Sequence, residues 1–220
     1  MISLGMATIP ARKRELEFVL DSLVGQVDEV FLALNYGDEP RPNYLDNYPN
    51  VYWWVNGTNL GDAEKFAMAI AVEGCYIGWD DDLIMGNSGI VKRLIDGVDK
   101  YNGLVSFHGK KYLPPVTDYR KWAGNYRCLG RVEEDVKVNL IGTGCCAFHT
   151  ARLKVSFSDF KIKNMADVWL SKIAHEQGVP MIVLAHDPRD LHYTNPEGGT
   201  IWSQTKEYSE HIKIMREFIK

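Results

Sequence analysis

The sequence predicts an α/β protein in which a mixed, mainly parallel central sheet is flanked by helices. Apolar runs alternate with amphipathic stretches through the first half of the chain, which is typical of parallel strands joined by crossover helices. The chain has 220 residues, 45% of them hydrophobic, and can bury a full core. No internal repeat, low-complexity tract or linker divides it, so we expect a single domain over residues 1–220.

The first elements read as a β-α-β unit. Residues 2–9 predict a strand, residues 12–24 carry apolar side chains at helical spacing, and residues 29–35 predict a second strand. Residues 36–50 are rich in Pro, Asn and Asp, so they predict a loop.

Two further strands and a helix follow this loop. Residues 51–55 and 75–79 read as strands, with a helix predicted between them over 63–71. Ser88 is expected to cap a helix that runs to about Tyr101.

The remainder of the chain is less regular. Residues 103–108 predict a strand, and 113–137 an irregular insertion over the sheet. Five more segments complete the prediction: a strand over 138–149, a helix over 166–177, a strand over 181–185, a loop over 186–199 and a helix over 203–220.

Charge and cysteine content argue against several classes of protein. A net charge of −4 gives no global attraction to nucleic acid, and the short basic run at 12–14 suits a helix start or one small anion. The four cysteines lack C-x-x-C spacing, so we expect reduced thiols and neither a zinc site nor a disulfide framework. We see no signal peptide and no apolar run near the ~20 residues of a membrane span. We therefore expect a cytoplasmic protein, or a catalytic piece of a longer one.

The most informative motif is the run Asp80, Asp81, Asp82 at the end of a predicted strand. Ligands of open α/β sheets bind beyond the carboxyl ends of strands. On an extended backbone Asp80 and Asp82 point to one side and Asp81 to the other. Such carboxylates suit Mg²⁺ or Mn²⁺ that also binds a substrate diphosphate. A solvated turn or a helix cap is the structural alternative.

Five segments together resemble the GT-A glycosyltransferases, and most closely the small bacterial and viral members of the family-2-like group. They follow the family's order over nearly the whole chain, and they are TIPAR, NLGDAEKF, WDDD, GTGCCAF and MADVWLS. The resemblance implies a Rossmann-like GT-A fold and a nucleotide-diphospho-sugar donor, with UDP as the expected nucleotide. The acceptor stays open among a glycan, a lipid-linked sugar, a protein and a modified nucleobase.

The resemblance also implies which residues bind the donor. They are Thr8, Pro10 and Arg12 around the nucleobase and ribose, Asp62 and Lys65 near the base or diphosphate, Asp80 and Asp81 in the acidic run, and Gly142 and Gly144 beside the sugar. Each has a structural alternative: a strand end with a proline turn, a helix cap, a solvated lysine, or a β-bulge at the glycines.

A metal site and a catalytic base complete what the resemblance implies. Asp82 matches the metal ligand, with Asp80 beside it, and His186 or otherwise His192 completes the metal shell. Asp167 matches the base of inverting enzymes, although Ala166 stands where the family pattern has Glu. An acid at a helix start is also an ordinary cap.

We therefore predict a metal-dependent, inverting glycosyltransferase of the hexosyltransferase type. A sugar nucleotidyltransferase would need a G-x-G-T-R stretch after the first strand, where the chain has MATIPARKR. A two-metal phosphotransferase or nuclease would need more acids near the aspartate run. A non-catalytic nucleotide-sugar-binding module would keep the fold, but the intact DDD and Asp167 favour an enzyme.

Overall fold

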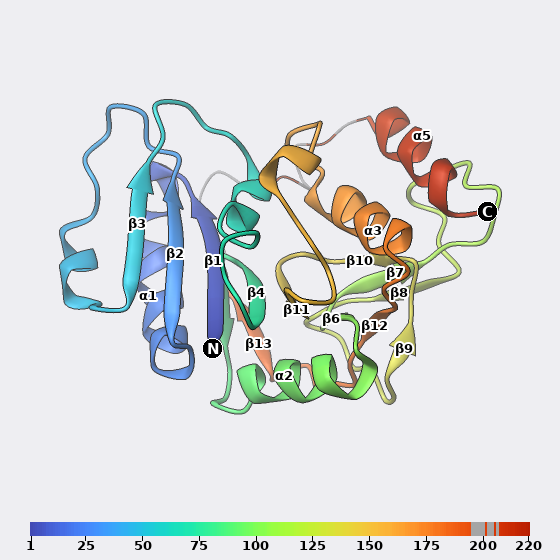
Figure 1. The fold of residues 1–220 in the computed structure, drawn as a ribbon, viewed down its shortest axis with the longest axis horizontal. Helices are drawn as coiled ribbons and strands as arrows, with labels where there is room; N and C mark the ends of the chain where they lie inside the picture. The colour runs from blue at the N-terminus through green and yellow to red at the C-terminus, as the bar shows by residue number, and fades with distance from the viewer. Residues whose placement is uncertain (195–200, 202–204, 206) are drawn as a thin grey trace.

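A mixed eight-stranded sheet forms the centre of the computed structural model, which describes residues 1–194, 201, 205 and 207–220 (Figure 1). In spatial order its strands are β3 (Val51–Val55), β2 (Glu29–Leu34), β1 (Ile2–Thr8), β4 (Cys75–Asp80), β11 (Cys145–His149), β6 (Leu104–Ser106), β12 (Met181–Val183) and β9 (Val136–Lys137). The first four run parallel, whereas β11 is antiparallel to both neighbours. The predicted class is confirmed.

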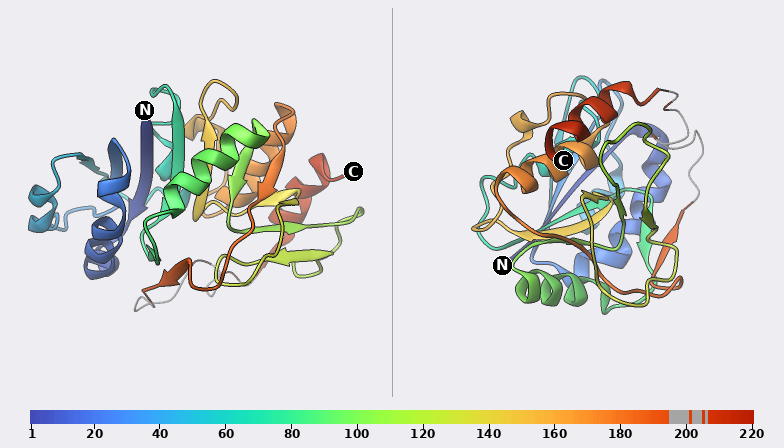
Figure 2. Two further views of the ribbon diagram at one scale, coloured as in Figure 1. Left: turned by 90° about the horizontal axis from the view of Figure 1, so that it is seen from below. Right: turned by 90° about the vertical axis from the view of Figure 1, so that its right-hand side faces the viewer.

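Helical segments cover both faces of this sheet (Figures 1 and 2). On one face, α1 (Lys13–Leu23) and α2 (Ile90–Tyr101) share one apolar core. On the other, α3 (Ala166–Glu176) packs with the 3₁₀ segment η4 (Asp62–Phe66). The last helix, α5 (Ser209–Phe218), packs against α3 at one end of the molecule.

Strand β4 shows how the sequence builds both cores. Ile77 and Trp79 are buried with α1 and α2, and Tyr76 is buried with η4 and α3. The split follows because successive side chains of a strand point to opposite faces.

The chain also forms two smaller sheets and several short 3₁₀ turns. A three-stranded sheet contains β10 (Leu140–Ile141), β7 (Gly109–Lys111) and β8 (Gly124–Tyr126), and a two-stranded one contains β13 (Leu191–Tyr193) and β5 (Leu83–Met85). The other 3₁₀ turns are η1 (Pro10–Arg12), η2 (Val24–Gln26), η3 (Asn43–Asn47) and η5 (Phe157–Asp159).

The helix predicted over 63–71 is wrong, because this segment is η4 followed by turns. Gly5 and Gly78 are paired neighbours on β1 and β4, and a Cβ on either would collide with η4. An α-helix keeps its axis about 8–10 Å from a packed neighbour. The paired glycines let this segment lie closer, so its backbone rests on the sheet.

Other boundaries also differ from the prediction. The strand expected over 138–149 is interrupted at 142–144, and the loop expected over 186–199 contains β13. Helix α2 follows Gly89 and has no side-chain cap from Ser88, and α5 begins only at Ser209. Residues 195–200, 202–204 and 206, most of which fall in the last two predicted segments, lie outside the described residues.

Two expectations about the whole chain can be compared with the structure. All four cysteines are buried free thiols, as expected. In the part of the chain that the structure describes, no helix combines the length and the apolar surface needed to cross a membrane.

Candidate active site

The carboxyl ends of β1 and β4 adjoin, because Ala7 lies opposite Asp80 in the sheet. Beyond β1 the chain passes through the 3₁₀ turn η1, which begins with Pro10 and ends with Arg12. Beyond β4 it turns at once, at Asp81 and Asp82. The predicted acidic run and the basic end of η1 therefore meet at one edge of the sheet.

Arg12 binds both buried acids of the run. Its guanidinium forms ion pairs with Asp81 and, at 2.9 Å between Nη1 and Oδ2, with Asp82. The predicted alternation of the aspartates is wrong, because the strand ends at Asp80 and the turn directs both following carboxylates to Arg12. Burial raises the pKa of Asp82 to about 7 and nearby Asp80 adds to the rise, while Arg12 opposes it.

Lys65 holds the third acid. Its side chain is only 2% exposed, so the alternative of a solvated lysine is excluded. The ammonium group pairs with Asp80 and lies 3.5 Å from the carbonyl oxygen of Thr143. Burial by itself would lower the pKa of Lys65, but the carboxylates of Asp80 and Asp62 raise it above its usual value. Lys65 is thus a buried ammonium group whose positive charge is stabilised by the carboxylates of Asp80 and Asp62.

Asp167 lies in the first turn of α3 and holds the turn between β10 and β11. Its Oδ1 accepts hydrogen bonds from the backbone N–H of Thr143 at 2.8 Å and from the Thr143 hydroxyl at 2.7 Å. The helix is tied to β10 as well, because the Ser171 hydroxyl accepts from the N–H of Ile141. One carboxylate oxygen of Asp167 therefore positions the GTG turn.

Asp62 links η4 to α3. Its Oδ2 accepts from the N–H of Ala166 at 3.3 Å, so it caps the first turn of a helix 104 residues further along the chain. Burial raises the pKa of Asp62 to about 6, while Lys65 opposes the rise. The structural alternative for Asp62 was a cap on its own segment. Asp62 instead caps α3, which is distant in the sequence.

The two glycines of GTGCC make room for side chains of the protein. A Cβ on Gly144 would collide with the Asp80 carboxylate, and one on Gly142 would lie 2.7 Å from the Cβ of His108. Gly144 also accepts a hydrogen bond from the backbone N–H of Asp80 at 2.9 Å. The close partners of these glycines in the chain are Asp80 and His108, and their approach to a donor sugar stays a prediction.

The histidines do not join the aspartates. His186 is buried, and its Nδ1 and Nε2 lie 2.7 Å and 2.9 Å from the carbonyl oxygens of Leu184 and Arg127. His192 is exposed on β13, opposite Ile84 of β5. Within the described ranges, no group of three or more His, Cys, Asp or Glu side chains is arranged to hold a metal ion.

Strand β13 nevertheless runs beside the acidic turn. The N–H of Thr194 donates to the carbonyl oxygen of Asp82 at 2.9 Å, and Tyr193 is paired with Leu83. The loop predicted after β12 therefore reaches the site through its backbone, and its histidines point elsewhere.

Three buried polar atoms around the strand ends have no hydrogen-bond partner within the described residues. They are Tyr36 Oη, Asp62 Oδ1 and Glu64 Oε2. Buried polar groups are normally hydrogen-bonded, and exceptions often mark a place for a ligand or water. These atoms flank the region where a nucleotide was predicted.

Sequence reasoning missed Thr143, Tyr36 and Glu64. Thr143 stands between the two glycines that were chosen, and its hydroxyl is the partner of Asp167. Glu64 is buried inside a predicted helix, where acids are expected to face solvent. Tyr36 is the second residue after the end of β2. Its position after a parallel strand was the available signal.

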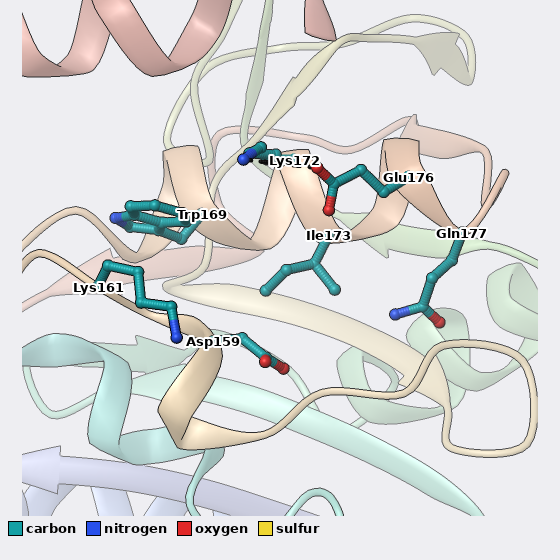
Figure 3. A pocket seen from close by; sticks show the side chains of 7 residues that line it. All are labelled: Asp159, Lys161, Trp169, Lys172, Ile173, Glu176 and Gln177. Atoms are coloured by element: carbon teal, nitrogen blue, oxygen red, sulfur yellow. Dashed lines mark ion pairs between the residues drawn. The ribbon is translucent and has the colours of Figure 1, made fainter. Parts of the chain in front are cut away.

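A cavity of about 250 Å³ lies away from these residues, on the outer side of α3 (Figure 3). Its charged groups already have partners: Lys161 donates to the carbonyl of Ser158, Lys172 pairs with Glu217, and Asp159 accepts from Ser156. Such satisfied groups offer little to a ligand, so we do not assign the chemistry to this cavity.

Comparison with known proteins was made by sequence and by structure. No protein-family model matches the chain, and no curated protein matches its sequence. Among solved structures, GalNAc-T7 with UDP, GalNAc and Mn²⁺ superposes with a TM-score of 0.65 at 10% identity, over 91% of this chain and 46% of that one.

Staphylococcus aureus TarS is similar as well. Its 1–349 portion in complex with UDP-GlcNAc gives a TM-score of 0.62 at 16% identity, over 99% of this chain and 65% of that one. Another TarS structure gives 0.53 at 13% identity, over 84% and 35%. The chain thus spans less than two thirds of each neighbour, and its fold is the GT-A fold that the resemblance implied.

Proposed function

We propose that this chain is a metal-dependent, inverting glycosyltransferase that transfers a sugar from UDP to an acceptor hydroxyl. One observation carries the proposal. Two sets of polar contacts meet at the acidic run on a GT-A fold: Arg12 pairs with Asp81 and Asp82, and the neighbouring Asp80 is linked through Lys65 and Thr143 to Asp167. The aspartate run would hold the metal ion and the donor diphosphate, and Asp167 would act as the base.

The donor side is supported by its unpaired polar atoms. Tyr36 Oη lies just past the end of β2, and Asp62 Oδ1 lies at the start of η4. A nucleoside offers both donors and acceptors to such groups. The UDP of two structural neighbours supports uridine as the base.

Asp80 and Asp82 fit a divalent cation. Mg²⁺ and Mn²⁺ are bound by one or two carboxylates together with phosphate oxygens of the substrate. Within the described residues the three carboxylates pair with two cations, Arg12 and Lys65, so a diphosphate would meet an excess of negative charge there. A bound cation neutralises the charge that develops on the leaving diphosphate. His186 does not fit as a further ligand, because backbone carbonyls occupy both ring nitrogens.

Asp167 suits the role of general base. Its Oδ1 is held by Thr143, so the carboxylate is oriented, and we assign the uptake of the proton to Oδ2. In the transfer, the acceptor hydroxyl gives its proton to Asp167 and its oxygen forms a bond to the anomeric carbon. The bond from that carbon to the diphosphate oxygen breaks, and UDP leaves with the electron pair from the opposite face. A positioned base commonly contributes ~10²- to 10⁴-fold in rate.

The test is release of UDP from a panel of UDP-sugars with Mn²⁺, together with product analysis by NMR. We expect at least one donor to be consumed, and Asp82→Asn to abolish both turnover and Mn²⁺-dependent binding of UDP. Full activity of the wild type in excess chelator would refute the metal dependence. Absence of any UDP binding would refute the donor assignment.

A further inference from the structure

Two of the four thiols, those of Cys128 and Cys145, belong to one cluster of polar groups that the proposed transfer does not use. Both thiols are free and buried in the core that contains α1 and α2. They hydrogen-bond each other, and the imidazole of His108 bonds Cys128 as well. The Cys128 Sγ also lies 3.6 Å from the hydroxyl of Tyr193. Three side chains that can donate a hydrogen bond therefore surround the sulfur of Cys128.

Cys145 has a fixed position in this cluster. It lies on β11, opposite Trp79 of β4, and β11 has a neighbouring strand on each side. Its Sγ lies 3.7 Å from the hydroxyl of Ser106, which accepts the backbone N–H of His108 at 3.0 Å. The Ser106 hydroxyl therefore ties the thiol of Cys145 to the residue that carries the imidazole.

Cys128 lies on a more open part of the chain. It is outside the regular strands, between β8 and β9, and its two neighbours, Arg127 and Leu129, are exposed. Cys128 itself is only 3% exposed, whereas Tyr193, which contacts it, is 40% exposed. A small local opening therefore brings the sulfur of Cys128 to solvent, whereas access to Cys145 requires the central sheet to open.

The contacts divide the two thiols into a nucleophile and its partner. The hydrogen bond with Cys145 lowers the pKa of Cys128, burial opposes this shift, and the hydrogen bond with His108 adds to the lowering. The hydrogen bond with Cys128 raises the pKa of Cys145, and burial adds to that rise. The thiolate, and not the thiol, is the nucleophile in thiol chemistry. Cys128 is therefore placed to attack, while Cys145 keeps its proton.

We propose that Cys128 and Cys145 are a redox-responsive pair, in which Cys128 attacks a low-molecular-weight disulfide and Cys145 then completes an intramolecular disulfide. In the first step the Cys128 Sγ bonds to one sulfur of the reagent, the S–S bond of the reagent breaks, and its other half leaves as a thiolate. In the second step the Cys145 Sγ bonds to the Cys128 Sγ and displaces the bound half, which takes the proton of Cys145. Two electrons thus pass to the reagent, which leaves as one thiolate and one thiol. Neither step involves UDP, so this reaction is independent of the proposed sugar transfer.

The pair lies close to the aspartate run. Tyr193, whose hydroxyl contacts Cys128, is paired with Leu83, the residue that follows Asp82. A hydrogen bond to a thiolate is charge-assisted, and the disulfide has no such charge. Oxidation therefore weakens the contact that Tyr193 makes from β13, beside the end of the run.

The test treats the reduced, folded wild type with cystamine, a small disulfide, at neutral pH. Acid quenching, alkylation of the remaining thiols and mass spectrometry of peptides then show which cysteines have reacted. Cys75 is the internal control, because at 8% it is the most exposed of the four cysteines, but burial raises the pKa of its thiol. Cys145→Ser removes the second step alone, since its hydroxyl can still donate to Cys128 but cannot form a disulfide. Cys75→Ser is the matched control variant.

In the wild type we expect the disulfide between Cys128 and Cys145 to form about tenfold or more faster than any modification of Cys75. In Cys145→Ser, Cys128 should instead accumulate as the mixed disulfide with cysteamine, and Cys75→Ser should react within about twofold of the wild type. The proposal is overturned if Cys75 reacts first, if the wild type gives only mixed disulfides or no modification, or if Cys128 of folded Cys145→Ser gains no cysteamine. The wild-type result needs no substitution, so it decides the question even where a variant does not fold.

Discussion

Replacing Asp167 by Asn separates the role of a base from the role of a structural anchor. Asn keeps an oxygen that can accept from both the N–H and the hydroxyl of Thr143, which lie at 2.8 and 2.7 Å from Oδ1. It cannot take up a proton from an acceptor. The variant should therefore retain the GTG turn and lose the chemistry.

The magnitudes of the two effects differ enough to be resolved. Loss of a general base predicts turnover slower by ~10²- to 10⁴-fold, or about 2.7 to 5.4 kcal/mol in activation free energy. Loss of the charge weakens two hydrogen bonds and the favourable interaction with the α3 N-terminus, which together contribute about 1–2 kcal/mol to folding. The melting temperature should fall by only a few degrees, about 2–4 °C per kcal/mol in a chain of this size.

The assay is UDP release from a UDP-sugar with water as the acceptor, so that it does not depend on knowing the natural acceptor. UDP binding and melting temperature are measured on the same samples. Asp159→Asn is the control, because Asp159 also accepts a backbone N–H within a short helical turn, from Ser156 in the capping box of η5, but outside the site. Near-normal turnover by Asp167→Asn, or a product with the anomeric configuration of the donor, would refute the assignment of Asp167 as an inverting base.

Four further predictions concern the donor side. Asp82→Asn should remove the stabilisation that UDP with Mn²⁺ gives in a thermal-shift assay, with Asp80→Ala less severe; unchanged stabilisation would contradict a metal site there. UDP should stabilise the wild type more than GDP or CDP at equal concentration, and a clear preference for another base would overturn the uridine assignment. Lys65→Met should lower the free energy of unfolding by about 1–3 kcal/mol in urea titrations, because Asp80 and Asp62 lose their shared cation; an unchanged midpoint would argue against that pairing. Asp62 has a pKa of about 6 in the folded chain against 3.8 as the ordinary value, so its carboxyl group binds more protons folded than unfolded. The unfolding free energy of the wild type, relative to Asp62→Asn, should therefore fall as pH rises between these values, by at most about 3 kcal/mol; a difference that is flat with pH would show that burial does not perturb Asp62.

Local sequence patterns were sufficient to predict most of the sheet. Residues 51–55 were predicted as a strand and form β3, and 2–9 and 29–35 differ from β1 and β2 by a single residue at the carboxyl end. For β1 and β2 the apolar runs settle these positions, because a buried parallel strand is apolar on both faces. The acidic run was placed correctly at the end of β4, because unpaired charges are costly to bury inside a strand that is apolar on both faces.

Five short segments in the order of the GT-A family also predicted, from the sequence alone, that a nucleotide binds at this edge of the sheet. It did not determine the helix over 63–71. That segment has helical composition, but Gly5 and Gly78 are 73 residues apart in sequence and become neighbours only through the register of β1 and β4. The hollow that they create selects a 3₁₀ turn, because packing overrides local propensity.

Only the tertiary structure decided how the charges are paired. The side-chain alternation that governs a strand stops where the strand stops, so it could not show that Asp81 and Asp82 both turn to Arg12, or that Lys65 belongs to Asp80. The contact of Thr143 with Asp167 likewise depends on where α3 docks against β10. These pairings join residues far apart along the chain, and burial makes them strong because few water molecules remain to screen the charges. Periodicity is a property of neighbouring residues, whereas a charged site is a property of the elements that the fold brings together.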